Sequence, residues 1–146
     1  VACGGSFMVK EEYIENGEFD KIRELTENAV KLMLGFSLKH VGINAECEED
    51  AIKVAEMFNI FGFASKIGNS SVFAGKEIEV MKKNGRGKYG HIAIGTNNVE
   101  RAEAYLKSKG YKFIEESRVT DDKGKSKALY FDADFGGFAV HLVLNK

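Results

Sequence analysis

An internal repeat is the feature of this sequence that most restricts its fold. His40-Val41-Gly42-Ile43 aligns with His91-Ile92-Ala93-Ile94 at an offset of 51 residues, and the same offset aligns Ala51 with Ala102. A repeat on this scale represents one supersecondary unit used twice, so its two copies should contain the same elements in the same order. The sequence therefore predicts two tandem modules.

Each module is expected to contain one strand, one helix and three further strands. In the first module, alternation over residues 38–43 predicts a strand, and the apolar spacing over residues 51–58 predicts a helix that ends near Gly62. In the second, residues 91–94 predict a strand and residues 102–110 a helix. The predicted fold is thus α+β with two βαβββ modules. The remaining predicted strands span residues 63–67, 71–74, 77–82, 112–119, 126–131 and 138–144.

Residues 1–36 have a different character, because they show helical periodicity and little strand signal. From Glu18 to Met33 the apolar residues recur at steps of three and four, and Gly35 supplies a stop signal. The predicted helix is amphipathic, so its apolar stripe requires a partner surface. We place a domain boundary after residue 36 and assign residues 37–146 to the repeated modules.

Composition excludes several classes of function. Lys and Arg number 21 against 22 Asp and Glu, so no excess positive charge is available for nucleic acid or an anionic membrane. No apolar run approaches the roughly 20 residues of a membrane span, and no signal-peptide pattern opens the chain. Cys3 and Cys47, its two cysteines, can form neither a disulfide framework nor a zinc–thiolate site. We expect a cytoplasmic protein.

The three histidines of the chain all occupy the same kind of position. In four of the predicted strands, branched apolar side chains lie on one face, and one His or Glu lies on the other. Gly42, Ala93 and Ala139 lie two residues from these polar groups on the same face and leave space beside them. The four polar residues are His40, Glu79, His91 and His141.

A single histidine in a strand is most often a hydrogen-bonded core or edge residue. Four polar residues placed by one repeat favour a shared role, because burying them costs free energy unless they are paired or bind a cation. Imidazole nitrogen and carboxylate oxygen suit Zn, Ni, Mn, Fe or Co. The sequence thus predicts a divalent metal site. The site would be catalytic if the ion keeps coordination positions open for water or substrate, and structural if the four residues fill a tetrahedral shell. Its predicted ligands are His40, Glu79, His91 and His141.

Residues 37–146 resemble the vicinal oxygen chelate superfamily, which includes glyoxalase I, bleomycin resistance proteins and extradiol dioxygenases. The resemblance implies a curved eight-stranded mixed sheet, metal ligands at the same four positions, and a homodimer or larger homo-oligomer. Where glyoxalase I has a final glutamate that is both ligand and base, this chain has His141, so Glu79 becomes the candidate base. The motifs that carry the resemblance are Leu38-Lys39-His40-Val41, Ile78-Glu79-Val80, Gly90-His91-Ile92-Ala93-Ile94 and Gly137-Phe138-Ala139-Val140-His141-Leu142.

Residues 1–36 resemble the C-terminal end of 2-keto-3-deoxy-6-phosphogluconate aldolase and of its relative acting on 4-hydroxy-2-oxoglutarate. The resemblance implies the last strand, the phosphate-binding turn and the last helices of a (β/α)8 barrel, with Gly4, Gly5 and Ser6 in the turn. No segment matches the Schiff-base lysine of that family, and a barrel takes about 250 residues. With Val1 in first place, the chain is expected to be the tail of a bifunctional bacterial aldolase, a lyase. The motifs are Ala2-Cys3-Gly4-Gly5-Ser6-Phe7-Met8-Val9 and Gly17-Glu18-Phe19-Asp20-Lys21-Ile22.

Two functional hypotheses remain open at this stage. In the first, a metal-dependent enzyme domain of lyase or isomerase type binds two neighbouring oxygens of a small oxo or hydroxy acid. The metal stabilises an enediolate-like charge, and Glu79 moves the proton. In the second, the domain is a non-catalytic module that binds a metabolite, or that assembles an oligomer through the helix from Glu18 to Met33.

Overall fold

The computed structural model describes residues 4–145 of the chain. Contacts divide the chain into two compact units, one that ends at Gly35 and one that begins at Phe36. Ala2 and Cys3, which open the aldolase-like motif, lie outside the described residues, as does Lys146.

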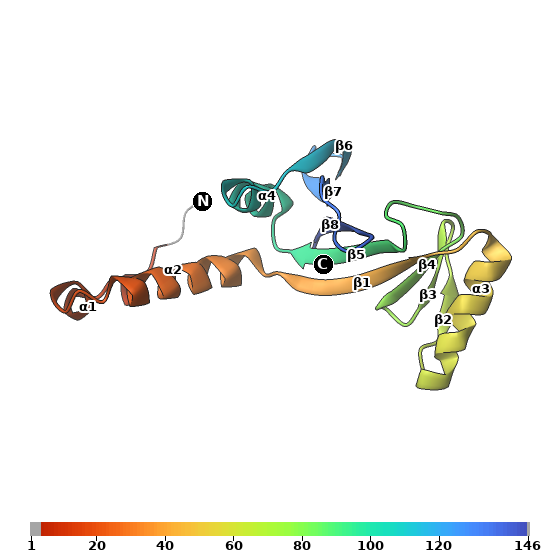
Figure 1. Cartoon of the computed structure of the whole chain (residues 1–146), viewed down its shortest axis with the longest axis horizontal. Helices are drawn as coiled ribbons and strands as arrows, with labels where there is room; N and C mark the ends of the chain where they lie inside the picture. The colour runs from red at the N-terminus through yellow and green to blue at the C-terminus, as the bar shows by residue number, and fades with distance from the viewer. Residues whose placement is uncertain (1–3, 146) are drawn as a thin grey trace. The chain divides into compact units, whose positions relative to one another are not determined.

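The N-terminal unit is helical over its described residues. A 3-10 turn, η1 (Ser6–Met8), precedes α1 (Glu11–Glu15) and the longer α2 (Phe19–Leu34) (Figure 1). Helix α2 ends at Gly35, which adopts the left-handed conformation (φ 61°) while its N–H donates to the carbonyl of Lys31. Glycine takes up this conformation without the steric cost of a Cβ atom, which is why the chain stops the helix there.

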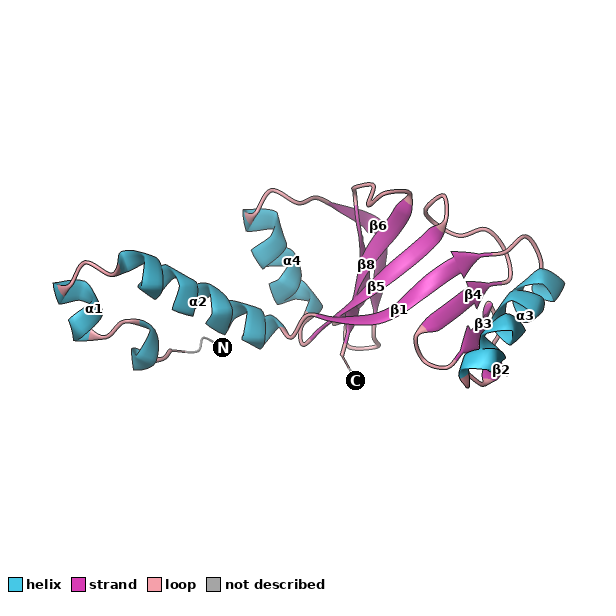
Figure 2. Ribbon diagram, turned by 60° about the horizontal axis from the view of Figure 1, so that its bottom comes forward, coloured by secondary structure: helices cyan, strands magenta, loops and turns pink. Residues whose placement is uncertain are grey.

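The second unit is one eight-stranded mixed sheet with two helices, so the predicted α+β fold is confirmed. The strand order β2-β3-β4-β1-β5-β8-β7-β6 places one module on each side of the β1–β5 pair, and the sheet is curved (Figure 2). The elements are β1 (Ser37–Asn44), α3 (Glu48–Met57), η2 (Phe58–Phe61), β2 (Ser65–Ile67), β3 (Ser71–Ala74), β4 (Ile78–Met81), β5 (Gly90–Thr96), α4 (Val99–Ser108), β6 (Phe113–Thr120), β7 (Ser126–Phe131) and β8 (Phe138–Leu144).

The strand pairing repeats between the modules. Strand β1 pairs in parallel with β4, β5 pairs in parallel with β8, and β1 and β5 join antiparallel at the centre of the sheet. The remaining pairs within each module are antiparallel. The sequence repeat is therefore also a structural repeat, and the antiparallel pairing places Val41 opposite its equivalent Ile92, with Gly42 opposite His91 and Ala93 opposite His40.

The apolar core lies on one face of the sheet, under the helices. In the first module, Ala51 and Ala55 of α3 pack against Val72 and Val80, all of them fully buried. In the second module α4 contacts β7 and β8, where Leu129 and Leu142 pair across the strands and are buried. Since strand side chains alternate, the residues between these apolar positions project to the opposite face.

The helix and strand boundaries differ from the predictions at the end of α3. The predicted strand over residues 63–67 begins only at Ser65, because η2 follows α3 and ends at Gly62 in the left-handed conformation (φ 84°). The apolar spacing of residues 58–61 thus belongs to a 3-10 turn. Among the helices of residues 4–145, none combines the length and apolar character needed to cross a membrane.

Candidate metal centre

Strand register brings the four predicted ligands onto one face of the sheet. Gly42, two residues after His40, pairs with Glu79, and Ala93, two residues after His91, pairs with His141. Directly paired residues share a face, so the repeat places Glu79 and His141 at equivalent positions of the two modules. We refer to the face that carries His40, Glu79, His91 and His141 as the histidine face.

A glycine makes room for one of the imidazoles. A Cβ atom on Gly42 would lie 2.1 Å from Cε1, 2.2 Å from Nδ1 and 2.6 Å from Nε2 of His91. The His91 ring therefore lies directly over the backbone of its cross-strand partner, which any larger side chain would displace. This position explains why the first module has Gly where the second has Ala93.

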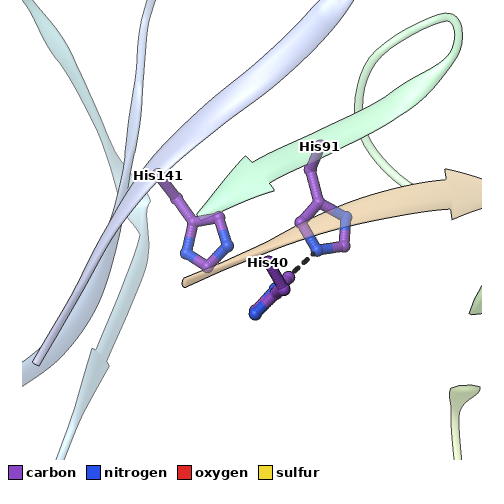
Figure 3. Close-up of side chains that lie close together, drawn as sticks. All are labelled: His40, His91 and His141. Atoms are coloured by element: carbon purple, nitrogen blue, oxygen red, sulfur yellow. Dashed lines mark hydrogen bonds between the residues drawn. The ribbon is translucent and has the colours of Figure 1, made fainter. Parts of the chain in front are cut away.

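Three of the four predicted ligand residues form a tight triangle of atoms. Nε2 of His40 lies 3.1 Å from Nε2 of His91, and each of these nitrogens lies 3.1 Å from Oε2 of Glu79. The His141 ring faces the same point, and one nitrogen from each of the three histidines lies within 4.8 Å of the others (Figure 3). The predicted residues thus form two overlapping groups, the triangle of His40, His91 and Glu79 and the set of three histidines.

The triangle fits the ligand shell of one cation. At a bond length of about 2.1 Å, neighbouring ligand atoms are about 3.0 Å apart in an octahedral shell and about 3.4 Å apart in a tetrahedral one. Shared protons satisfy the triangle less well, because two N–H groups donating to Oε2 would also face each other. Imidazole and carboxylate donors suit the divalent transition metals predicted from the sequence.

Ser71 orients the Glu79 carboxylate. Its hydroxyl donates to Oε1 of Glu79 at 2.7 Å, and the residue is buried at 4% exposure. Oε1 is therefore occupied, and Oε2 is the oxygen that faces the histidines. Ser71 is not among the site residues predicted from the sequence, because a serine in a strand carries no signal until its register places it beside a carboxylate.

Glu79 is held in its ionised form. Burial raises the pKa of this carboxyl, but hydrogen bonds with His40, His91 and Ser71 together outweigh burial and keep the pKa well below its ordinary value. A carboxylate with a low pKa is a good cation ligand and a weak proton acceptor.

His141 is neutral and buried. Only 8% of it is exposed, and among the described residues neither ring nitrogen has a hydrogen-bond partner. Burial, assisted by His91 and His40, lowers its pKa to about 4. An unsatisfied buried polar group typically costs about 1–3 kcal/mol, a cost that a bound cation would remove.

Two aromatic residues flank the histidines at equivalent positions. Phe73, which pairs with Glu79, has its ring 5.9 Å from that of His40, and Tyr130, which pairs with His141, stacks on that ring at 4.6 Å. Burial raises the Tyr130 pKa, as does the Glu79 carboxylate, so its hydroxyl stays protonated. Neither aromatic is among the predicted site residues, because only the strand register shows that they flank the cluster.

The residues predicted to bind phosphate lie in the N-terminal unit. Ser6 begins the single turn η1, and Gly4 and Gly5 line a cavity of about 340 Å³. The rest of this cavity is lined mainly by apolar side chains, including Phe7 and Met33. Phosphate binding by Gly4, Gly5 and Ser6 stays a prediction.

Comparison with known proteins identifies the fold. No protein-family profile and no curated protein sequence matches this chain. Hypothetical protein BH1468 from Bacillus halodurans superposes with a TM-score of 0.54 at 17% identity, over 77% of this chain and 96% of that one. Methylmalonyl-CoA epimerase from Mycobacterium tuberculosis superposes with a TM-score of 0.51 at 15% identity, over 78% of this chain and 90% of that one. A methylmalonyl-CoA epimerase variant from Streptomyces coelicolor, in complex with 2-nitronate-propionyl-CoA, superposes with a TM-score of 0.51 at 17% identity, over 75% of this chain and 94% of that one. At such identities the likeness concerns the fold alone.

Replacing Gly42 by Ala should displace the His91 ring. Ala is favoured over Gly inside a strand, yet the clash with the ring should lower the free energy of unfolding by about 1–3 kcal/mol, as overpacking does. Denaturant unfolding and the NMR shift of the His91 Hε1 proton measure the two effects. Gly85→Ala is the matched control, since its new Cβ would meet only Asn44 Oδ1, at 3.4 Å. Equal stability of both variants and an unmoved His91 signal would contradict this packing.

The stability of the metal-free protein should fall as pH decreases from 6.5 to 4. In this window the unfolded state protonates His141 (ordinary pKa 6.5), while the folded state, with a pKa of about 4, does not. The loss should amount to roughly 3 kcal/mol, and below pH 4.5 the lowered pKa of Glu79 adds to it. Denaturant unfolding at several pH values in chelator measures the slope. His141→Phe keeps an aromatic ring against Tyr130 and should flatten the slope; an unchanged slope would assign the titration to other groups.

Proposed function

We propose that residues 36–146 form a divalent-metal-binding, glyoxalase-like domain that binds a small oxo or hydroxy acid. His40, Glu79, His91 and His141 would hold the metal. The observation that carries this proposal is the triangle of donor atoms 3.1 Å apart beside a buried histidine with two unused ring nitrogens. The methylmalonyl-CoA epimerases that share the fold act, by their name, on an acyl-CoA, which supports a small-molecule ligand for this fold.

When bound, such a metal would polarise two neighbouring oxygens of the ligand and stabilise negative charge on them. Glu79 is the candidate base, because it is the carboxylate of the cluster. Its Oε1 already accepts the Ser71 hydroxyl, and its Oε2 faces His40 and His91. Accepting a proton from the ligand therefore requires Glu79 to give up one of these contacts.

The low pKa of Glu79 favours the second function that the sequence left open, ligand binding without turnover. A general base works best when its pKa lies near the working pH, and Glu79 lies far below that range. The same cleft would then serve as a metabolite-binding module. Binding and catalysis differ in one observable, the exchange of a carbon-bound proton of the ligand.

For the N-terminal unit we propose the end of an aldolase barrel, the lyase partner of the domain. Support comes from the apolar side of α2, where 64% of Phe19 and 41% of Met33 are exposed. Apolar side chains at this exposure need a covering surface. A barrel or a second copy of the chain in a homo-oligomer would provide one.

Elemental analysis tests the metal site. Protein purified without chelator or metal-affinity resin should contain one equivalent of a transition metal. His91→Ala and Glu79→Gln should each weaken binding more than tenfold, since loss of even an outer-shell partner typically costs about 10- to 100-fold. Glu77→Gln is the matched control, because Glu77 is exposed and hydrogen-bonds the neighbouring Lys76 N–H. A wild-type protein that stays metal-free after incubation with Zn, Ni, Mn and Fe would refute the proposal.

Ser71→Ala should distinguish catalysis from binding. The variant loses the hydroxyl that occupies Oε1 and lowers the Glu79 pKa, so Glu79 becomes a stronger base. If Glu79 is the base, exchange of the C3 protons of 2-oxobutanoate in D2O, followed by NMR, should run severalfold faster with the metal-loaded variant than with wild type. If both proteins bind 2-oxobutanoate but neither accelerates its proton exchange over the rate without protein, the result would support the non-catalytic module and exclude Glu79 as the base. Metal content measured on the same samples shows that the comparison is between loaded proteins.

A further inference from the structure

The histidine face is flanked by two pockets at equivalent positions of the two modules. Lys66 of β2 pairs with Phe73, which pairs with Glu79, so all three residues project to the histidine face. In the second module Ile114 pairs with Tyr130, which pairs with His141. Lys66 and Ile114 therefore occupy equivalent positions, one cationic and the other apolar.

The pocket of the first module is basic. It has a volume of about 840 Å³, and Lys66, Lys76 and Phe73 lie in its wall. No carboxylate lines it, and among the described residues neither lysine takes part in an ion pair. Glu77 is adjacent, and its Oε2 accepts the backbone N–H of Lys76, so its carboxylate offsets part of the charge of Lys76. Lys66 supplies the remaining positive charge of the pocket, whose lining holds no carboxylate.

The pocket of the second module is balanced in charge. It has a volume of about 500 Å³, and Arg86 and Lys88 share its lining with Asp132 and Asp134. The Arg86 guanidinium lies over the Tyr130 ring, 5.3 Å from its centroid. An anion entering here would meet two carboxylates as well as two cations, so the first-module pocket is the better anion site.

Lys66 lies two strands away from Glu79, which is on the nearest strand of the cluster. Two strand spacings separate Lys66 from Glu79, about 10 Å between the backbones at about 4.8 Å per strand. Phe73, whose ring lies 5.9 Å from that of His40, forms an apolar surface between the two ends.

From this arrangement we propose that Lys66, in the basic pocket of the first module, binds a second anionic group of the ligand. The ligand class is therefore an oxo or hydroxy acid with an oxygen pair at one end, a short carbon chain over Phe73, and a carboxylate or phosphoryl group at the other end. The inference rests on the proposed metal site. Because the equivalent position in the second module is Ile114, the ligand binds in one orientation.

Calorimetric titration of the metal-loaded protein tests this inference. The probes are 2-oxoglutarate and 2-oxopentanoate, which have five carbons each. The first ends in a second carboxylate, and the second ends in a methyl group. A third probe, 2-oxo-4-phosphonobutanoate, separates a preference for a phosphoryl group from one for a carboxylate. Wild type should bind at least one of the doubly acidic probes about tenfold more tightly than 2-oxopentanoate, the effect expected of one charge-assisted contact.

Lys66→Gln should reduce the preference for the doubly acidic probe over 2-oxopentanoate to less than about twofold, because the contact of Lys66 with the second anionic group contributes to binding of the doubly acidic probe alone. It should leave both the affinity for 2-oxopentanoate and the metal content unchanged. Lys53→Gln is the matched control: it makes the same change in the same module, on α3, which packs against the opposite face of the sheet. Arg86→Gln tests the second pocket, and both of these variants should keep the preference.

Three results would overturn the inference. The first is that metal-loaded wild type binds the singly and doubly acidic probes with equal affinity, or binds none of them. Either outcome would refute the role of Lys66 without affecting the proposed metal site. Another is a preference that survives Lys66→Gln or disappears in Arg86→Gln, which would place the anion elsewhere. The third is a protein that takes up no metal, which refutes the proposed function together with this inference.

Discussion

The antiparallel pairing of β1 with β5 is the contact on which the rest of the structure depends. It joins two modules of the same order into one sheet and places His40 and His91 on adjacent strands of one face. The parallel partners β4 and β8 then add Glu79 and His141 from either side. A one-residue slip in the pairing of β1 and β5 would turn one histidine to the opposite face and dismantle the cluster. Register therefore governs the candidate site as strongly as the identity of its residues.

The cluster places polar side chains on a buried part of the sheet, and these side chains differ in how many hydrogen bonds they receive. Glu79 has three hydrogen-bonding partners and stays ionised, whereas His141 has none among the described residues and stays neutral. This combination prepares one anionic oxygen ligand and one neutral imidazole ligand for a cation. The same hydrogen bonds make Glu79 a weak base, so a strong metal site and an efficient proton acceptor make opposing demands on one carboxylate.

Duplication explains both the symmetry of the site and the departures from it. Phe73 and Tyr130 flank the cluster at equivalent positions, and so do the two pockets. Lys66 and Ile114 break this symmetry, because they give the two ends of the histidine face different charge and polarity. A duplicated fold becomes selective for an unsymmetrical ligand through differences of this kind.

The sequence by itself determined the repeat, the order of its strands and helices, and the face on which each histidine lies, because alternation and helical periodicity are local properties of the chain. Strand ends near Gly62 were less predictable, since the 3-10 turn η2 has the same apolar spacing as a helix. Ser71, Phe73, Tyr130 and Lys66 became recognisable as neighbours of the cluster only in the tertiary structure. Their roles follow from cross-strand register, which brings together residues far apart in the chain and which no local pattern encodes.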